Sequence, residues 1–199
     1  MAIVDRVKAI CLKPKEEWDV IAGETTSTAD LLKNYALPLA AIGAVASFIG
    51  ASFIGVSVPF IGTIRAPVVS GLVAAAAHLA LMLVAVYLLG MIIDALAPQF
   101  GAQKNKDQAL KIAVYSFTPG WVAGVLRILP SLGILSLIAM GYGIYVMHLG
   151  LQQLMKPPKE KAATYTVVVV LCGVGLMIVL GLVVGAITAP AMLAAPGLR

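Results

Sequence analysis

The sequence predicts an all-α integral membrane protein: a bundle of five transmembrane helices preceded by an amphipathic helix at the membrane interface. Of the 199 residues, 61% are hydrophobic and only 12% are charged, whereas in soluble domains about half are apolar and about a quarter charged. Five apolar runs are each long enough to cross a bilayer. The basic residues cluster between these runs, mostly on alternate sides of the membrane, as in a multi-pass protein.

Composition also narrows the classes of function. A soluble fold of 199 residues has too little interior to bury this much apolar surface. The net charge of +5 comes largely from residues that orient the spans, so we do not expect nucleic acid as a partner. The two cysteines, Cys11 and Cys172, lie far apart in the chain and indicate neither a disulfide framework nor a metal site.

Residues 1–34 are predicted to form a cytoplasmic amphipathic segment. Apolar residues recur there at helical spacing, and Pro14 begins a second short helix that contains Trp18. Such a helix typically lies at the interface with its apolar face among the headgroups. Docking of a cytosolic partner is the alternative, and Cys11 is a weak candidate for acylation. The residues expected on the interfacial face are Val7, Ile10, Pro14 and Trp18.

The apolar runs define five spans and leave little chain between them. A transmembrane helix needs about 20 residues, and each run is close to or above that length. The connection between the third and fourth spans is a tight turn in which Pro130 begins the fourth helix, and no loop has room for a catalytic domain. The spans are predicted at 35–56, 67–94, 109–128, 131–154 and 164–189, followed by a short external tail at 190–199.

The lysines and arginines predict the orientation. Eleven of the fourteen lie before the first span, around the start of the third, or between the fourth and fifth. Only Arg65, Arg127 and Arg199 fall on the opposite side. Because cytoplasmic loops carry the excess of Lys and Arg, the N-terminus is expected in the cytoplasm and the C-terminus outside, which requires an odd number of spans.

Small residues at four-residue intervals predict where helices pack closely, since they let two backbones approach each other in lipid. The first span carries such a groove, and the third and fifth spans carry glycine pairs. Seams inside the bundle are the expected use of these positions. The alternative is that they form a face for homo-oligomer formation. The spacing alone does not distinguish this from packing within the bundle. The positions are Gly43, Ser47, Ala51, Gly55, Gly120, Gly124, Gly181 and Gly185.

Polar side chains within the spans are the first place to look for function. Asp94, Tyr115 and His148 fall at similar depth near the inner ends of their spans, and Pro119 predicts a kink because it crowds the Tyr115 carbonyl. Ordinary structural roles, such as hydrogen bonding within the bundle, are the alternative for each. The candidate intramembrane polar cluster is Asp94, Tyr115, Ser116, Pro119 and His148, and His78 is a separate mid-membrane candidate.

Motifs of the familiar enzymes are missing from the sequence. It contains no HExxH metal motif, no GxSxG nucleophile elbow and no phosphate-binding loop. We therefore predict no catalytic residues, no metal ligands and no cofactor, and we expect that the protein is not an enzyme.

Four stretches carry a family resemblance. In the order KPKEEWDVIAGE, KNYALPLAAIGAVASFIG, AVYSFTPGWVAGVL and YGIYVMHLGLQQLM, they resemble short bacterial members of the Yip family (Ypt/Rab-interacting membrane proteins), over nearly the whole chain. The most similar features are the Pro14–Trp18 spacing, the Tyr35–Pro38 helix start, and Tyr115–Pro119 followed by Tyr142–Tyr145. The resemblance implies five spans with the N-terminus in the cytosol, no known enzymatic activity, and a multi-pass protein of the bacterial inner membrane.

The resemblance does not extend to every property of the eukaryotic relatives, which act in vesicle traffic and bind Rab-type GTPases. Those proteins have a long acidic and polar N-terminal region and an Asp-Leu-Tyr-Gly-Pro stretch. This chain has neither, with only residues 1–34 before the first predicted span. These departures argue against GTPase binding.

The preferred functional hypothesis is a non-enzymatic scaffold or adaptor in the lipid bilayer of the inner membrane. It would bind an unidentified membrane or cytosolic protein partner through its N-terminal helix and its small-residue faces. One alternative is a small transporter or an ion or proton pathway that uses the inner-half polar residues. A second is a lipid-binding or membrane-shaping protein that acts through the N-terminal segment.

Overall fold

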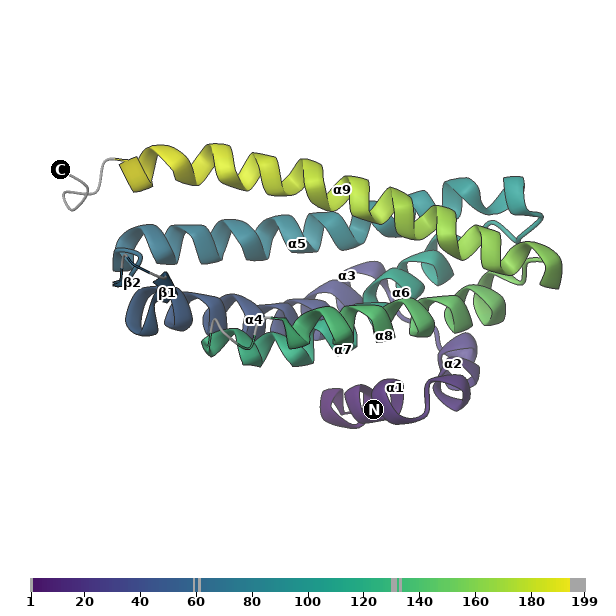
Figure 1. Ribbon diagram of the computed structural model, residues 1–199. Coiled ribbons are helices and arrows are strands. Elements are labelled where there is room, and N and C mark those ends of the chain that lie inside the picture. Colours follow the sequence, from purple (N-terminus) through teal and green to yellow (C-terminus); the bar gives the residue numbers. More distant parts are fainter. Residues whose placement is uncertain (1, 59, 61, 130–131, 133, 194–199) are drawn as a thin grey trace.

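The computed structural model describes residues 2–58, 60, 62–129, 132 and 134–193, and it is mostly helical (Figure 1). The first half of the chain forms two short helices, a first span and a small β-hairpin. Its elements are α1 (Ile3–Leu12), α2 (Pro14–Gly23), α3 (Thr28–Leu31), η1 (Leu32–Ala36), α4 (Leu37–Ile49), η2 (Gly50–Ile54), β1 (Val56–Val58) and β2 (Gly62–Ile64).

The second half of the chain forms four further spans, three of which consist of more than one type of helical turn. Its elements are α5 (Val68–Leu96), η3 (Ala97–Phe100), α6 (Lys106–Ser116), α7 (Thr118–Ala123), η4 (Gly124–Ile128), α8 (Leu135–Gly150), η6 (Leu151–Met155) and α9 (Lys159–Leu193).

Five helices in the described ranges are long and apolar enough to cross a membrane, which confirms the predicted number of spans. The first begins at Thr28 rather than at residue 35, because Ser27 caps it by accepting a hydrogen bond from the Asp30 N–H (3.0 Å). The predicted helix start at Pro130–Ser131 and most of the predicted tail lie outside the described residues. The spans are Thr28–Ile54, Val68–Phe100, Lys106–Ile128, Leu135–Met155 and Lys159–Val183.

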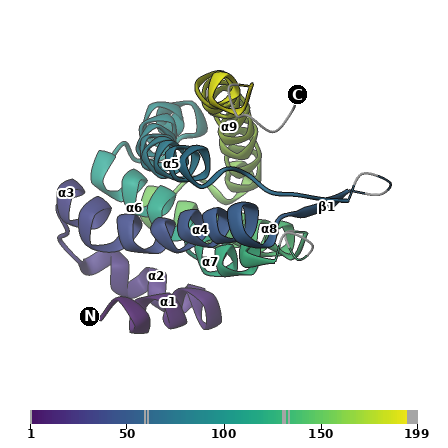
Figure 2. The same cartoon turned by 90° about the vertical axis from the view of Figure 1, so that its left-hand side faces the viewer.

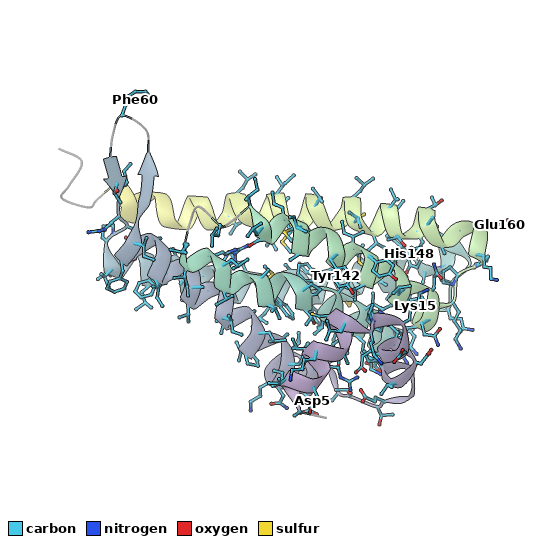
Figure 3. All side chains as sticks on the ribbon, turned by 60° about the horizontal axis from the view of Figure 1, so that its bottom comes forward. Asp5, Lys15, Phe60, Tyr142, His148 and Glu160 are labelled. Carbon is cyan, nitrogen blue, oxygen red and sulfur yellow. The ribbon has the colours of Figure 1, made fainter. Side chains whose placement is uncertain are left out.

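The β-hairpin is an element that the all-α prediction missed. Strands β1 and β2 pair antiparallel at the end of the bundle opposite the N-terminal helices, and Phe60 lies at the tip (Figure 3). Gly55 enters the hairpin with a φ of 87°, a backbone conformation that glycine adopts without strain. Gly55 therefore belongs to a turn rather than to the small-residue groove in which it was predicted.

The spans are arranged with the third at the centre. Helices α5 and α9 lie side by side on one face, and α4, α7 and α8 form the other (Figures 1 and 2). Within their most apolar windows the third span is 67% buried and the fifth only 11%. The third span is therefore the core of the bundle, and α9 is the helix most open to lipid.

The third span is interrupted at Phe117, where a kink was predicted. Helix α6 ends at Ser116 and α7 begins at Thr118, with Pro119 in its first turn. A proline is tolerated there because the first turn does not need its N–H. The Phe117 N–H donates to the Val114 carbonyl (3.2 Å) instead of continuing the α-helical ladder.

Glycines form one close seam between the first and third spans. A Cβ atom at Gly124 would lie 2.9 Å from the Gly43 Cα, so the two backbones are in direct contact. Ser47 and Ala51 are half-buried on the same span. Gly120 is also half-buried, with Met140 as its nearest neighbour. By contrast, Gly181 lies on the exposed side of α9, and a Cβ there would meet none of the described residues within 4 Å. Gly185 is also exposed on α9.

Substitution of Gly124 tests this seam. We expect Gly124→Ala to destabilise the protein by about 1–3 kcal/mol, because the new methyl group meets backbone that cannot rotate away. Gly181→Ala is the matched control, since a Cβ there meets nothing within 4 Å, and its stability should be unchanged or slightly higher. Denaturant titration in detergent micelles measures both, and equal destabilisation by the two changes would contradict the assignment.

Candidate functional site

The two N-terminal helices, α1 and α2, form a hairpin whose apolar side packs against the bundle. Ile10, Trp18 and Ile21 are 0–1% exposed, Pro14 is buried and Val7 is half-buried. This corrects the prediction that the apolar face lies among headgroups. An amphipathic pattern shows which face of a helix is apolar but not what that face packs against. Here the apolar face packs against the helices of the bundle.

Trp18 is the central contact of the hairpin with the bundle. Its indole N–H donates to the Val146 carbonyl (3.0 Å), which satisfies a polar group that would otherwise be buried without a partner. The ring lies against Gly150, where a Cβ atom would come within 2.6 Å of it. The Tyr142 hydroxyl of α8 also donates to the Cys11 carbonyl (3.0 Å) at the end of α1.

A buried ion cluster holds the hairpin in shape. The Arg6 guanidinium binds the carboxylates of both Glu17 and Glu24, and the side chains of Arg6 and Glu17 are each 6% exposed. Burial alone would lower the pKa of Arg6, but the hydrogen bond to Glu24 and the nearby negative charges raise it above its ordinary value. Because removing one partner of a buried pair leaves a costly lone charge, the cluster ties α1 firmly to α2.

Lys111 of α6 binds the C-terminal end of α2. Lys111 is 3% exposed, and its ammonium donates to the carbonyls of Ile21 (3.2 Å) and Glu24. The last carbonyls of a helix lack intrahelical partners, and a cation there is favoured by the helix dipole. The core span thus supplies the cap of a helix outside the bundle.

Aromatic rings join the ion cluster to the bundle. The Arg6 guanidinium lies 5.6 Å from the centre of the Tyr115 ring, a distance typical of a cation–π interaction. The Tyr115 ring meets Tyr35 (4.8 Å between centres) and Trp18 (6.1 Å) edge to face. The Tyr35 hydroxyl is 2.9 Å from the Thr118 hydroxyl.

The predicted intramembrane polar cluster is not assembled. Tyr115 faces the hairpin, whereas the His148 ring binds the Thr166 hydroxyl (2.7 Å) on α9. The Asp94 carboxylate lies 4.0 Å from the Lys104 ammonium. This is a correction: the direction of each span predicts the depth of a residue, but not the side of the helix on which it lies.

The remaining candidates have separate surroundings. Ser116 is 6% exposed, and its hydroxyl has no hydrogen-bond partner among the described residues. Its carbonyl lies against Gly143 of α8. Pro119 shapes the start of α7, and His78 is half-buried within α5. None of these positions adds a reactive group to the cluster around Arg6.

The sequence analysis did not single out the four charged residues that form the ion cluster and cap the end of α2. Lys111 carried a signal, since a lysine inside a predicted span is rare unless it has a partner. Arg6 lies one turn from Ile10, on the apolar face of α1. The charges of Glu17 and Glu24 resemble those of any solvated helix, so nothing in the pattern distinguished them. The four residues are Arg6, Glu17, Glu24 and Lys111.

Two surface clefts flank residues 24–27, the linker between the hairpin and the first span; we call them the linker clefts. Their volumes of about 580 and 410 Å³ fall in the range of ligand sites. Both include Glu24, Thr25 and Thr26. No group of three or more metal-ligating side chains occurs in the described part of the chain. The larger cleft also contains Arg6, Asp30, Asn34, Tyr35 and Tyr115, and the smaller Asn105, Asp107, Gln108 and Lys111.

Known proteins resemble this chain over most of its length. It is 24% identical over 156 residues to "Inner membrane protein YohC" of Escherichia coli (strain K12), a match that covers 77% of this chain and 80% of the relative. The protein of the same name from Escherichia coli O6:H1 matches equally well. No solved structure matches. These relatives confirm the predicted inner-membrane location. Because the model of the Yip1 domain matches residues 8–194, the chain belongs to the Yip1 domain family.

Proposed function

We propose that the protein is a non-enzymatic scaffold or adaptor that binds a partner protein in the linker clefts. The observation that carries this proposal is the pairing of charges at the site. Arg6 is held by Glu17 and Glu24, and Lys111 is held by the α2 carbonyls. A general acid or base needs a group that is free to exchange a proton with a substrate, whereas this cluster builds a rigid platform with two open clefts beside it.

The proposed orientation places the linker clefts in the cytoplasm and the C-terminus outside. The distribution of Lys and Arg supports it, because the basic loops 101–105 and 156–158 lie at the same end of the bundle as α2 (Figure 1). The partner would then be a cytosolic protein or the cytosolic part of a membrane protein. A homo-oligomer through the exposed surface of α9 around Gly181 is compatible with this proposal, and we do not propose a GTPase as partner.

Site-specific photocrosslinking in cells tests the clefts. We expect p-benzoylphenylalanine at Asn34 and at Asn105, which line different clefts, to give an adduct of the same partner. Lys15, exposed on the hairpin away from both clefts, is the matched control position and should give none. Thr26→Trp, which fills the shared wall, should abolish both adducts. Equal adducts at all three positions, or none at the cleft positions, would overturn the proposal.

A small transporter or ion pathway is the second candidate function. It is favoured by Asp94, which is 3% exposed in a membrane span and has one carboxylate oxygen without a hydrogen-bond partner among the described residues. Intramembrane acids commonly mark ion or proton paths. Proteoliposome flux of protons or monovalent cations that falls in Asp94→Asn and His148→Ala would support it, and flux unchanged by both would exclude it.

A further inference from the structure

Two loops that are distant in the sequence form one surface at the end of the bundle. The first, residues 101–105, joins η3 to α6, and the second, residues 156–158, joins η6 to α9. The Gln103 N–H donates to the Met155 carbonyl (2.7 Å). Gly101 lies against Pro158, whose ring atoms are 3.4 Å from the position that a Cβ would take. The two loops therefore hold each other in place.

This surface gathers five exposed lysines, which we call the lysine shelf: Lys104, Lys106, Lys156, Lys159 and Lys161. Among the described residues, only Lys104 of the five has a carboxylate within 4.0 Å, the buried Asp94. Asp107 and Glu160 are neighbours of shelf lysines in the sequence. On the hairpin, by contrast, Lys13 pairs with Glu16 (3.4 Å). The shelf is thus a concentration of largely unpaired positive charge.

The shelf rests on a fixed base. The rings of Phe100 and Tyr165 stack with centres 4.8 Å apart and an interplanar angle of 16°. The Tyr165 hydroxyl donates to the Ile93 carbonyl, so the first turns of α9 are tied to the end of α5. The backbone that carries the lysines is therefore held in place, so it need not be ordered when an anion binds.

The flanks of the shelf are apolar and exposed. Met91 of α5 and Val167 and Leu171 of α9 are 40–64% exposed, and both helices lead directly to the shelf (Figure 1). Glu160 marks this end of α9 in Figure 3. A ligand of the shelf therefore meets apolar helix surface on one side and water on the other, which is the environment of a phospholipid at a membrane surface.

We propose that the lysine shelf binds the headgroup phosphates of anionic phospholipids, while their acyl chains lie along α5 and α9. Clusters of lysines beside transmembrane helices attract anionic lipids, and the apolar flanks distinguish this ligand from an acidic protein in solution. The shelf adjoins the smaller linker cleft, because Asn105 lies between Lys104 and Lys106, but the five lysines line neither cleft. The proposal does not depend on the proposed scaffold function. Lipid binding by the N-terminal segment was the second alternative from the sequence, and the present proposal assigns lipid binding to the loops of the membrane domain instead.

Native mass spectrometry of the full chain in detergent, titrated with phosphatidylglycerol or phosphatidylcholine, tests the proposal. The shelf variant carries Lys104→Gln, Lys156→Gln and Lys159→Gln, and the control variant carries Lys8→Gln, Lys13→Gln and Lys15→Gln, so each loses three charges. We expect the shelf variant to bind phosphatidylglycerol at least tenfold more weakly and the control variant to stay within twofold of the unmodified protein. Phosphatidylcholine binding should be equal for all three.

Equal losses in the two variants would show non-specific attraction to charge and overturn the site, as would full binding by the shelf variant. Displacement of phosphatidylglycerol by inorganic phosphate at the same concentration would overturn the lipid assignment in favour of a small-anion site. Photocrosslinking from Asn34 should be unchanged in the shelf variant, so failure of this proposal and failure of the scaffold proposal give different results.

Discussion

Arg6→Gln is expected to open the N-terminal hairpin by separating α1 from α2, which frees α1 from its packing on the bundle. The change leaves Glu17, whose side chain is 6% exposed, without its cation. Breaking a buried pair in this way costs about 3–5 kcal/mol, and since 1.4 kcal/mol is a factor of ten, opening of the hairpin should become roughly a hundredfold more frequent or more. The spans themselves should remain folded, because the ion cluster lies outside them.

Cys11 provides the measurement. Burial raises the pKa of its thiol, so little thiolate is present in the docked hairpin and alkylation is slow. In a Cys172→Ser background, Arg6→Gln should therefore accelerate alkylation of Cys11 by a large factor. Lys13→Gln is the control, since its ion pair with Glu16 is exposed and contributes little. Equal alkylation rates in the two variants would show that the ion cluster does not hold the hairpin.

The number and approximate bounds of the spans could be predicted because they depend on local composition. The length of an apolar run and the position of lysines do not require knowledge of tertiary contacts. The same is true of the interruption before Pro119, where the missing N–H acts within one turn of helix. The start at Thr28 was missed because the capping residue Ser27 lies in a polar stretch that the hydropathy pattern assigns to the loop.

The faces of the helices could not be predicted in the same way. Asp94, Tyr115 and His148 were grouped by depth, but each contacts a different neighbour because rotation about the helix axis is set by packing. Gly181 has the same spacing to the next glycine as a seam residue, yet a seam also needs a partner helix at that height. The ion cluster around Arg6 could not be predicted from the sequence because its members come from different helices.

Trp18→Ala should have a comparable effect on the hairpin for a different reason. The side chain is 1% exposed, and removing a buried tryptophan costs about 3–5 kcal/mol through lost burial and the cavity that remains. The Val146 carbonyl also loses its donor. Hydrogen exchange of the α1 and α2 amides should accelerate accordingly, while Val20→Ala, at a position 50% exposed on α2, should change it little.

The contact between Trp18 and Gly150 allows the loss of hairpin docking in Trp18→Ala to be distinguished from a general loss of stability. Gly150→Ala alone should destabilise the docked hairpin by about 1–3 kcal/mol, because the new methyl group overlaps the indole ring. In the Trp18→Ala background the same methyl group enters the vacated space, so its cost should vanish. A double-mutant cycle measured by hydrogen exchange then gives a large coupling between the two residues. Additive effects would mean that the ring does not lie on Gly150.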